Sequence, residues 1–324
     1  MQLALKVDVD TWRGTRQGVP RLAEMLSRAG ARASFLFSLG PDHTGRAVKR
    51  VFRRGFVGKV SRTSVLSHYG LTTLLYGTLL PGPDIGRGCS AILRSVREQG
   101  FEVGIHTWDH VAWQDAVATA DPAWTERQMN LAVQRFIEVF EEAPRVHGAA
   151  GWQMNRHAVR LTQRLGFTCS SDCRGSAPFM PVWDGEMVHC PQLPTTLPTL
   201  DEVIGLDGVT AQTAAQAILA RTDLTGGSAR PDALQVFTLH AELEGMKLAS
   251  VFQELLDGWR AQGYELVDLS TALGSLEVSR LPRHRLEFGS VPGRTGTLLV
   301  QGAEFLSGAA PALTGSAGGN PLLG

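Results

Sequence analysis

Short apolar runs alternate with amphipathic helical segments along most of this chain, and this alternation limits the fold more than any other feature. The first run, QLALKVDVD (2–10), precedes the helical pattern VPRLAEMLSRAG (19–30), which ends on a glycine. Similar pairs recur as far as the strand pattern YELVDLS (264–270). Repeated strand–helix units build a mainly parallel sheet, open or closed into a barrel. We therefore expect an α/β fold with its functional side chains at the C-terminal ends of the strands.

The rest of the alternating pattern consists of further predicted strands and helices. The further predicted strands are 33–40, 101–110, 145–151, 167–175 and 234–242. The further predicted helices are 84–100, 125–143, 155–166 and 247–263.

Composition excludes several classes of protein. The 324 residues include 31 Lys and Arg against 31 Asp and Glu, and this balance argues against a nucleic-acid-binding protein. Four cysteines are too few for a disulfide scaffold in a chain of this length, so we expect reduced thiols. The candidate site begins at Asp8, where a cleaved leader would remove it, and no apolar run approaches the roughly 20 residues of a membrane span. The sequence therefore predicts a cytoplasmic protein.

Two regions interrupt the strand–helix alternation. No acidic residue occurs in 43–83, whereas seven basic residues do: Arg46, Lys49, Arg50, Arg53, Arg54, Lys59 and Arg62. This basic and apolar insert is predicted to be helical, and it either covers the sheet or contacts an anionic membrane surface. The second region, 289–324, is rich in Gly, Ala, Ser and Pro and is predicted to be a flexible C-terminal tail.

Candidate chemistry begins with two pairs of polar residues. Asp8 and Asp10 lie on the same face of an extended strand, because side chains alternate with period two. His106 and His110, in HTWDH, are spaced so that both can bind one metal ion. Two histidines and one carboxylate make a metal site with an open position for water, and the other carboxylate can act as the general base.

Two further residues stand at predicted strand ends. Asp172 lies in SSDCRG, and His240, in FTLHAE, is a candidate for protonating a leaving group. Each motif also has a structural interpretation. The aspartates can cap a helix, Asp172 can pair with Arg174, and His240 can be a hydrogen-bonded core residue. The cysteines, including those of CSSDC, match no common structural zinc spacing.

Together these motifs resemble the polysaccharide deacetylase-like carbohydrate esterases over about residues 2–275. That family has a distorted (β/α) barrel and uses one divalent metal ion, zinc or similar, to hydrolyse N-acyl groups on sugars. The resemblance implies that Asp8 is the base and that Asp10, His106 and His110 hold the metal. It also implies that His240 is the general acid and that Asp172 orients it.

A narrower resemblance rests on DVDTWRGTRQGVPRL, GIHTWDHVAWQ, AAGW, SDCRGSAPFMP, LPTTLPTLDEVIG and TLHAELEG. These motifs are similar to those of deformylases within this family that act on an undecaprenyl phosphate-linked formamido sugar, in lipid A modification and polymyxin resistance. The resemblance implies a lipid-linked amino sugar as partner and peripheral contact with the inner face of the inner membrane. An N-deacetylase of another glycan and a non-catalytic saccharide-lipid binder are the alternatives.

One family feature is missing. Many members have an arginine beside the base in the third motif, where this chain has AAGW. Arg13 and Arg174 are the candidates for supplying that charge. Substrate contacts are also expected from aromatic rings near the metal, which stack on sugar faces or belong to the core. These rings are Trp12, Trp108 and Trp113.

Overall fold

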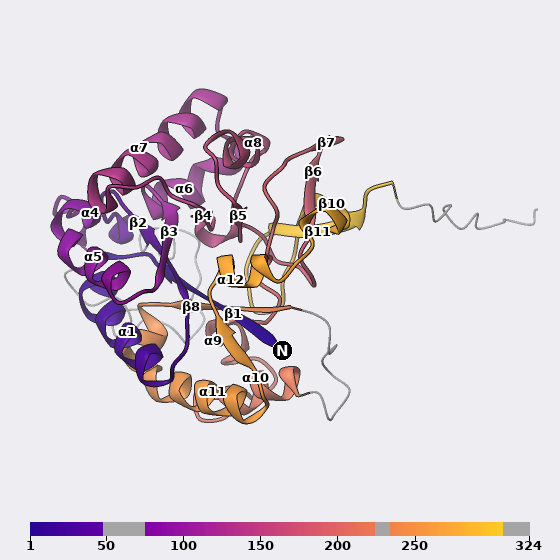
Figure 1. Ribbon diagram of the computed structural model, residues 1–324. Helices are drawn as coiled ribbons and strands as arrows, with labels where there is room; N and C mark the ends of the chain where they lie inside the picture. Colours follow the sequence, from indigo (N-terminus) through magenta and orange to yellow (C-terminus); the bar gives the residue numbers. More distant parts are fainter. Residues whose placement is uncertain (48–74, 224–233, 307–324) are drawn as a thin grey trace, which may run out of the picture.

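A parallel sheet wrapped by helices forms the body of the molecule in this computed structural model, which describes residues 1–47, 75–223 and 234–306 (Figure 1). The strands run in the order β5-β4-β3-β2-β1-β8, and β9 also pairs with β1. Their bounds are β1 (Gln2–Val9), β2 (Ser34–Ser38), β3 (Glu102–Thr107), β4 (Val146–His147), β5 (Cys169–Ser170), β8 (Gln235–His240) and β9 (Glu265–Val267). All of these pairings are parallel, so every strand brings its C-terminal end to the same edge.

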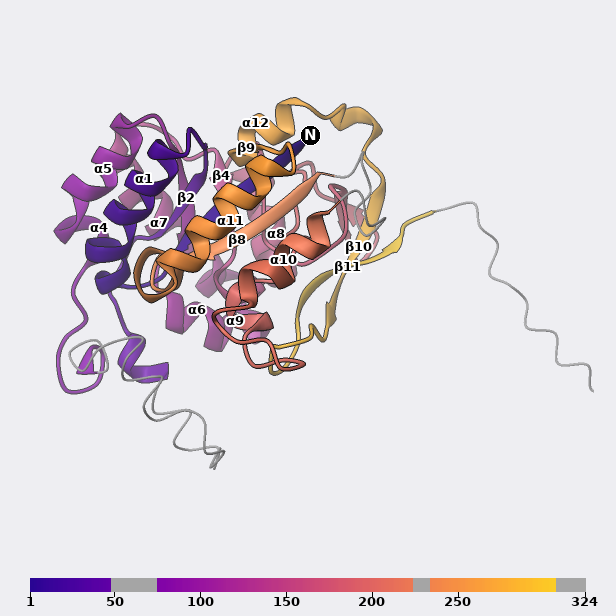
Figure 2. The ribbon, with the colours of Figure 1, turned by 90° about the horizontal axis from the view of Figure 1, so that it is seen from below.

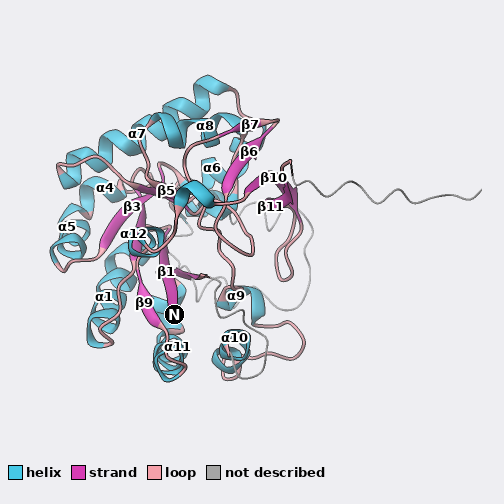
Figure 3. Ribbon diagram, turned by 45° about the vertical axis from the view of Figure 1, so that its right-hand side comes forward, coloured by secondary structure: helices cyan, strands magenta, loops and turns pink. Residues whose placement is uncertain are grey.

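Amphipathic helices cover the outside of this sheet (Figures 1 and 3). Helix α1 (Val19–Arg28) shows the reason, because its buried residues Val19, Leu22, Ala23 and Leu26 follow helical spacing. The other long helices are α5 (Ser90–Glu98), α7 (Pro122–Phe140), α8 (Arg156–Arg164), α10 (Ala214–Thr222) and α11 (Ala249–Ala261). The short ones are α4 (Ile85–Gly88), α6 (His110–Ala116), α9 (Leu200–Val203), α12 (Leu269–Gly274), η1 (Gly14–Gly18), η3 (Val117–Thr119), η4 (Ala150–Trp152), η5 (Leu243–Lys247) and η6 (Val278–Arg280).

The arrangement is a distorted, incomplete (β/α) barrel, which confirms the predicted fold class. The predicted strands and helices occur, with one difference at 84–100. There the backbone of Cys89 leaves the helical region (φ −112°, ψ 11°) and separates α4 from α5. None of the helices in the described ranges is long and apolar enough to span a membrane.

A second, smaller sheet lies beside the first (Figures 1 and 2). It consists of β6 (Met180–Trp183), β7 (Glu186–Met187), β10 (Arg283–Gly289) and β11 (Leu298–Glu304), in the order β11-β10-β6-β7. The prediction of a flexible tail from 289 is therefore wrong for residues 289–306. Strand β11 pairs with β10, and Leu299 is fully buried. The folded unit thus extends beyond 275, while 307–324 lie outside the described residues.

The basic insert is described only at its two ends, because 48–74 lie outside the described residues. Pro41 and Asp84 form a β-bridge, and the Asp42 amide donates a hydrogen bond to the Pro83 carbonyl (2.9 Å). The segment therefore leaves and re-enters the fold at one place, next to the C-terminal end of β2.

Candidate active site

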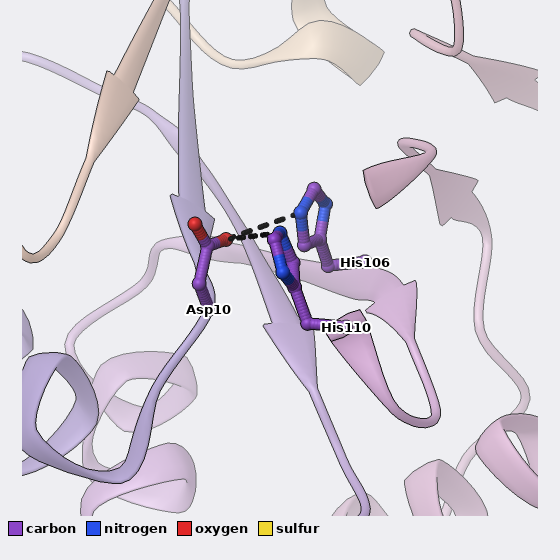
Figure 4. A group of neighbouring side chains, drawn as sticks. All are labelled: Asp10, His106 and His110. Carbon is purple, nitrogen blue, oxygen red and sulfur yellow. Dashed lines mark ion pairs between the residues drawn. The ribbon is translucent and has the colours of Figure 1, made fainter. Parts of the chain in front are cut away.

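Three side chains from separate elements converge where the first strands end (Figure 4). Asp10 directly follows β1, His106 is in β3, and His110 is the first residue of α6. The Nε2 atoms of His106 and His110 lie 3.2 and 3.4 Å from the Asp10 Oδ1 atom. One ligand atom from each residue lies within 4.8 Å of the others. The structure therefore brings together the three residues predicted to hold a metal.

The protonation of these groups suits a cation. The Nδ1 atom of His106 lies 2.7 Å from the Gly148 carbonyl, which can only accept a hydrogen bond. In the neutral ring Nε2 then presents a lone pair toward Asp10, whose buried Oδ1 atom has no hydrogen-bond donor. Two acceptors that face one another fit a divalent metal ion, and nitrogen and carboxylate donors are typical zinc ligands.

Electrostatics favour the ligand form of Asp10 and His110, whereas a metal ion at this site would compete with a proton on His106. Burial raises the pKa of Asp10, but His110 and His106 outweigh it, and the pKa lies below its usual value. Burial lowers the pKa of His110 and keeps this ring neutral, as a metal ligand must be. For His106, burial lowers the pKa, and the carboxylates of Asp8 and Asp10 outweigh it and raise the pKa.

Asp8 is buried on β1 beside this triad, with one oxygen engaged and one open. Its Oδ2 atom lies 3.2 Å from the ammonium of Lys6, whereas its buried Oδ1 atom has no hydrogen-bond partner. Lys6 is fully buried and donates to the Ser171 carbonyl (3.1 Å). A carboxylate with one oxygen held by Lys6 and the other, 3.6 Å from His106 Nδ1, without a hydrogen bond is suited to accept a proton.

Lys6 was missed by the sequence analysis, which assigned the charge beside the base to Arg13 or Arg174. The assignment to Arg174 is wrong, whereas that to Arg13 stays a prediction. Arg174 is buried against Glu202 and donates to the Leu197 carbonyl (3.0 Å), so that it holds a structural ion pair. Arg13 lines a separate groove at the surface. The available signal was a lysine inside an apolar strand, two residues before Asp8 and hence on the same face.

His240 ends β8, next to the base. It is the register partner of Asp8 on the adjacent strand. Its Nδ1 atom lies 4.0 Å from Asp201 Oδ1 and has no hydrogen bond. Burial raises the pKa of Asp201, but His240 and Arg294 outweigh it, and the pKa is lowered. The carboxylate beside His240 is thus that of Asp201, in α9.

Asp172 does not orient His240, so this prediction is wrong. Its Oδ1 atom lies 2.7 Å from His147 Nδ1 and accepts a hydrogen bond from the Ala149 amide (2.9 Å). Its other oxygen accepts from Gln192 (3.2 Å). Fully buried among these donors, Asp172 fixes the loop after β4.

A cation-rich wall around Trp152 completes the site. The ring of Trp152 is buried, and His240 meets it edge-on with centroids 6.3 Å apart. The guanidinium groups of Arg174 and Arg294 lie 5.0 and 4.9 Å from its centroid, and the Lys6 ammonium lies 5.3 Å away. Trp152 has φ +52°, a strained conformation of the kind that clusters at functional sites.

The predicted tryptophans differ in position. Trp113 is 2% exposed, and its indole donates to the Gln153 carbonyl (2.7 Å), so that its predicted role in stacking on the sugar is wrong. Trp108 is half-buried beneath Arg135, whose guanidinium lies 5.1 Å from the ring centroid. Trp12 is half-buried too, and its amide donates to Asp42 Oδ2 (2.9 Å).

All four cysteines are free and buried, as predicted. Burial raises the pKa of Cys89 to about 11 and that of Cys190 to about 12, so these thiols stay protonated at neutral pH. Within the described part of the chain, Asp10, His106 and His110 are the one candidate metal cluster.

Comparison with known proteins agrees with this arrangement. The family model "Polysaccharide deacetylase" matches residues 4–170. The chain is 34% identical over 300 residues to the "Probable 4-deoxy-4-formamido-L-arabinose-phosphoundecaprenol deformylase ArnD" of Shewanella sediminis (strain HAW-EB3), with 93% of this chain and 94% of that protein covered. It is 31% identical over 290 residues to the protein of the same name from Wigglesworthia glossinidia brevipalpis, with 89% and 98% covered.

A solved structure shares the fold. The crystal structure of a "putative polysaccharide deacetylase from Mycobacterium smegmatis" superimposes with a TM-score of 0.59 at 14% identity, over 90% of this chain and 96% of that one. This chain belongs to the polysaccharide deacetylase family, and it is a hydrolase that acts on an amide C–N bond. Within the family it is similar to the ArnD deformylases, which confirms the narrower resemblance of its motifs.

Proposed function

We propose that this protein removes the formyl group from 4-deoxy-4-formamido-L-arabinosyl undecaprenyl phosphate and releases formate and the 4-amino sugar lipid. The observation that carries the proposal is the placement of a carboxylate with a free oxygen, Asp8, between the metal triad and His240. The names of the two relatives supply the substrate. The freed amine adds positive charge to the lipid-linked sugar, in keeping with a role in lipid A modification and polymyxin resistance.

The chain's residues divide the chemistry. A divalent cation, zinc or similar, held by Asp10, His106 and His110 would polarise the formamide carbonyl and lower the pKa of a water molecule. Asp8 takes a proton from the attacking water through Oδ1, while Lys6 holds Oδ2 in place. The C–N bond of the formamide then breaks, and His240 donates a proton to the leaving nitrogen.

Asp201 supports this role of His240. Its carboxylate faces Nδ1 of the ring at 4.0 Å and so favours a proton on Nδ1. The second proton of the doubly protonated ring, on Nε2, is then the one donated to the leaving nitrogen. We expect Asp201→Asn to lower kcat at least about tenfold while the bound metal is retained. Metal content and the pH–rate profile of the variant test this. An unchanged rate and profile would remove Asp201 from the mechanism.

Formate release from a synthetic formamido-arabinosyl lipid phosphate tests the function. The wild-type protein should release formate, chelator should stop the reaction, and Asp8→Asn should abolish it at equal metal content. Asp121→Asn is a matched control, since Asp121 only caps α7 at the surface. Faster hydrolysis of the acetamido analogue would favour the N-deacetylase alternative. Binding of the lipid without any formate release would favour the non-catalytic binder.

We infer that the protein works in the cytoplasm at the inner face of the inner membrane, in peripheral contact through the 43–83 segment. The described end of this segment exposes apolar residues, with Leu79 81% and Leu80 41% exposed. His43, at its start, lies 2.6 Å from Asp109, which directly precedes the metal ligand His110. Apolar and basic residues in a segment that begins beside the metal triad suit a substrate held at an anionic bilayer surface.

A further inference from the structure

A basic groove opens between the two π-helices next to the candidate active site. It has a volume of about 340 Å³ and is lined by Arg13, Gln17, Arg21, Glu242, Gly245, Met246 and Lys247. Helix η1 follows β1 and the metal ligand Asp10, whereas η5 follows β8 and His240. The groove therefore lies between the segments that follow the metal ligand Asp10 and the proposed acid His240.

Close backbone packing builds this groove. A Cβ atom on Gly18 would lie 2.0 Å from the Ala241 carbonyl, and one on Gly14 would lie 1.9 Å from Glu242 Oε1. Only glycine permits this approach of η1 to the segment that leads into η5. Single-turn π-helices of this kind occur often at functional sites.

The charge of the lining is strongly positive. Arg13 and Arg21 come from the η1 side and Lys247 from η5, and Arg21 donates to the Met246 carbonyl (3.2 Å) across the groove. Glu242 is the one acidic residue of the lining. It is turned to the protein, because its Oε1 atom accepts from the Asp10 amide (3.1 Å) and the Thr11 amide (2.8 Å). Three cations that line one groove favour the binding of an anion.

The position of the groove specifies that anion. Glu242 joins the groove floor to the metal site through the Asp10 backbone. In the proposed substrate, the formamide at carbon 4 and the phosphate at carbon 1 stand on opposite sides of one sugar ring. A sugar with its formamide at the metal triad can thus direct its phosphate toward the neighbouring loops. We propose that this groove binds the phosphate diester of the lipid-linked sugar, an assignment that rests on the proposed function.

Two water-soluble glycosides test the assignment with the full chain loaded with metal. One is a short-chain alkyl phosphodiester of 4-formamido-4-deoxy-arabinose, and the other is the methyl glycoside without phosphate. The groove variant is Arg13→Gln/Arg21→Gln/Lys247→Gln. The matched control, Arg164→Gln/Arg221→Gln/Arg260→Gln, loses the same charge at exposed positions on helices α8, α10 and α11.

The wild-type protein and the control should prefer the phosphodiester by kcat/KM. In the groove variant this preference should fall on the order of a hundredfold, mainly through KM, because charge-assisted hydrogen bonds to the phosphate are lost. An unchanged preference in the groove variant would overturn the assignment while the proposed function stands.

Calorimetry separates a failed assignment from a failed function. Pentyl methyl phosphate, a diester, should bind the wild-type protein and the control but not the groove variant, whether or not formate is released. If no glycoside releases formate, the proposed function fails. The binding of pentyl methyl phosphate then still tests whether the groove binds a phosphate diester. Binding of inorganic phosphate alone, with no difference between the diester and a neutral alcohol, would mark a site for free phosphate and overturn the assignment.

Discussion

The buried pair of Lys6 and Asp8 offers the sharpest test of the site's construction. The ammonium and the carboxylate lie 3.2 Å apart, with side chains 0% and 4% exposed. At an effective dielectric constant of about 20, two unit charges at that distance attract by about 5 kcal/mol. Removal of one partner from a buried pair costs about 3–5 kcal/mol, because the other charge is left uncompensated. We expect Lys6→Met and Asp8→Asn each to lower the free energy of unfolding by about that amount.

The double variant distinguishes pairing from packing. In Lys6→Met/Asp8→Asn no charge is left unpaired, so that its loss of stability should be smaller than the sum of the single losses by at least about 2 kcal/mol. Urea unfolding of the metal-free protein measures this. With a slope of about 3 kcal/mol/M, each single variant should lower the midpoint by about 1–2 M.

An exposed ion pair provides the control. Arg97 and Glu142 form an ion pair at 2.8 Å, but their side chains are 51% and 43% exposed. The same cycle with Arg97→Met and Glu142→Gln should give a coupling of less than about 1 kcal/mol. If the losses from Lys6→Met and Asp8→Asn add within about 0.5 kcal/mol, Lys6 does not hold the base, and the reasoning fails.

Three further predictions concern the metal, the pH dependence of stability and the membrane. His110→Ala should lose bound metal on dialysis while Asp8→Asn keeps it, as measured by elemental analysis, and equal loss would make Asp8 a ligand. Burial raises the pKa of Glu244 from 4.5 to about 7, so its stabilising contribution is full below pH 4.5 and is lost as the pH rises through 7. In Glu244→Gln, the fall in the free energy of unfolding between pH 4.5 and 7, measured by urea unfolding, should be smaller by on the order of 3 kcal/mol. An equal fall in the variant and the wild-type protein would contradict this prediction. Leu79→Ser should weaken co-sedimentation with anionic vesicles roughly tenfold, unlike Leu306→Ser at a similarly exposed position, and equal effects would speak against membrane contact.

The sequence predicted the metal triad because its members obey local rules. Asp10 follows an apolar strand, and the spacing of His106 and His110 places both on one side of a turn. Residues at the C-terminal ends of parallel strands meet at the same edge of the sheet in any fold of this class. The convergence of these side chains therefore required no knowledge of long-range packing.

The partner of His240 obeys no such rule. Asp172 follows β5 and Asp201 lies in α9, both between β5 and β8, and both carboxylates are plausible from composition. The choice depends on the path of the chain, which gives Asp172 to His147 and leaves Asp201 facing His240. Side-chain pairing between distant loops is decided by tertiary packing, which sequence patterns do not encode locally.

The C-terminal region shows why composition misled. Glycine-rich segments are typical of flexible tails, yet glycine also permits the turn between β10 and β11, where Gly293 and Gly296 have φ +82° and +83°. That turn carries Arg294 to Asp201 (3.2 Å) and over the ring of Trp152. Asp201 in turn faces His240. The small sheet therefore contributes to the active site through the contact of Arg294 with Asp201. The region predicted to be least ordered thus supplies the cation that fixes the partner of the proposed acid.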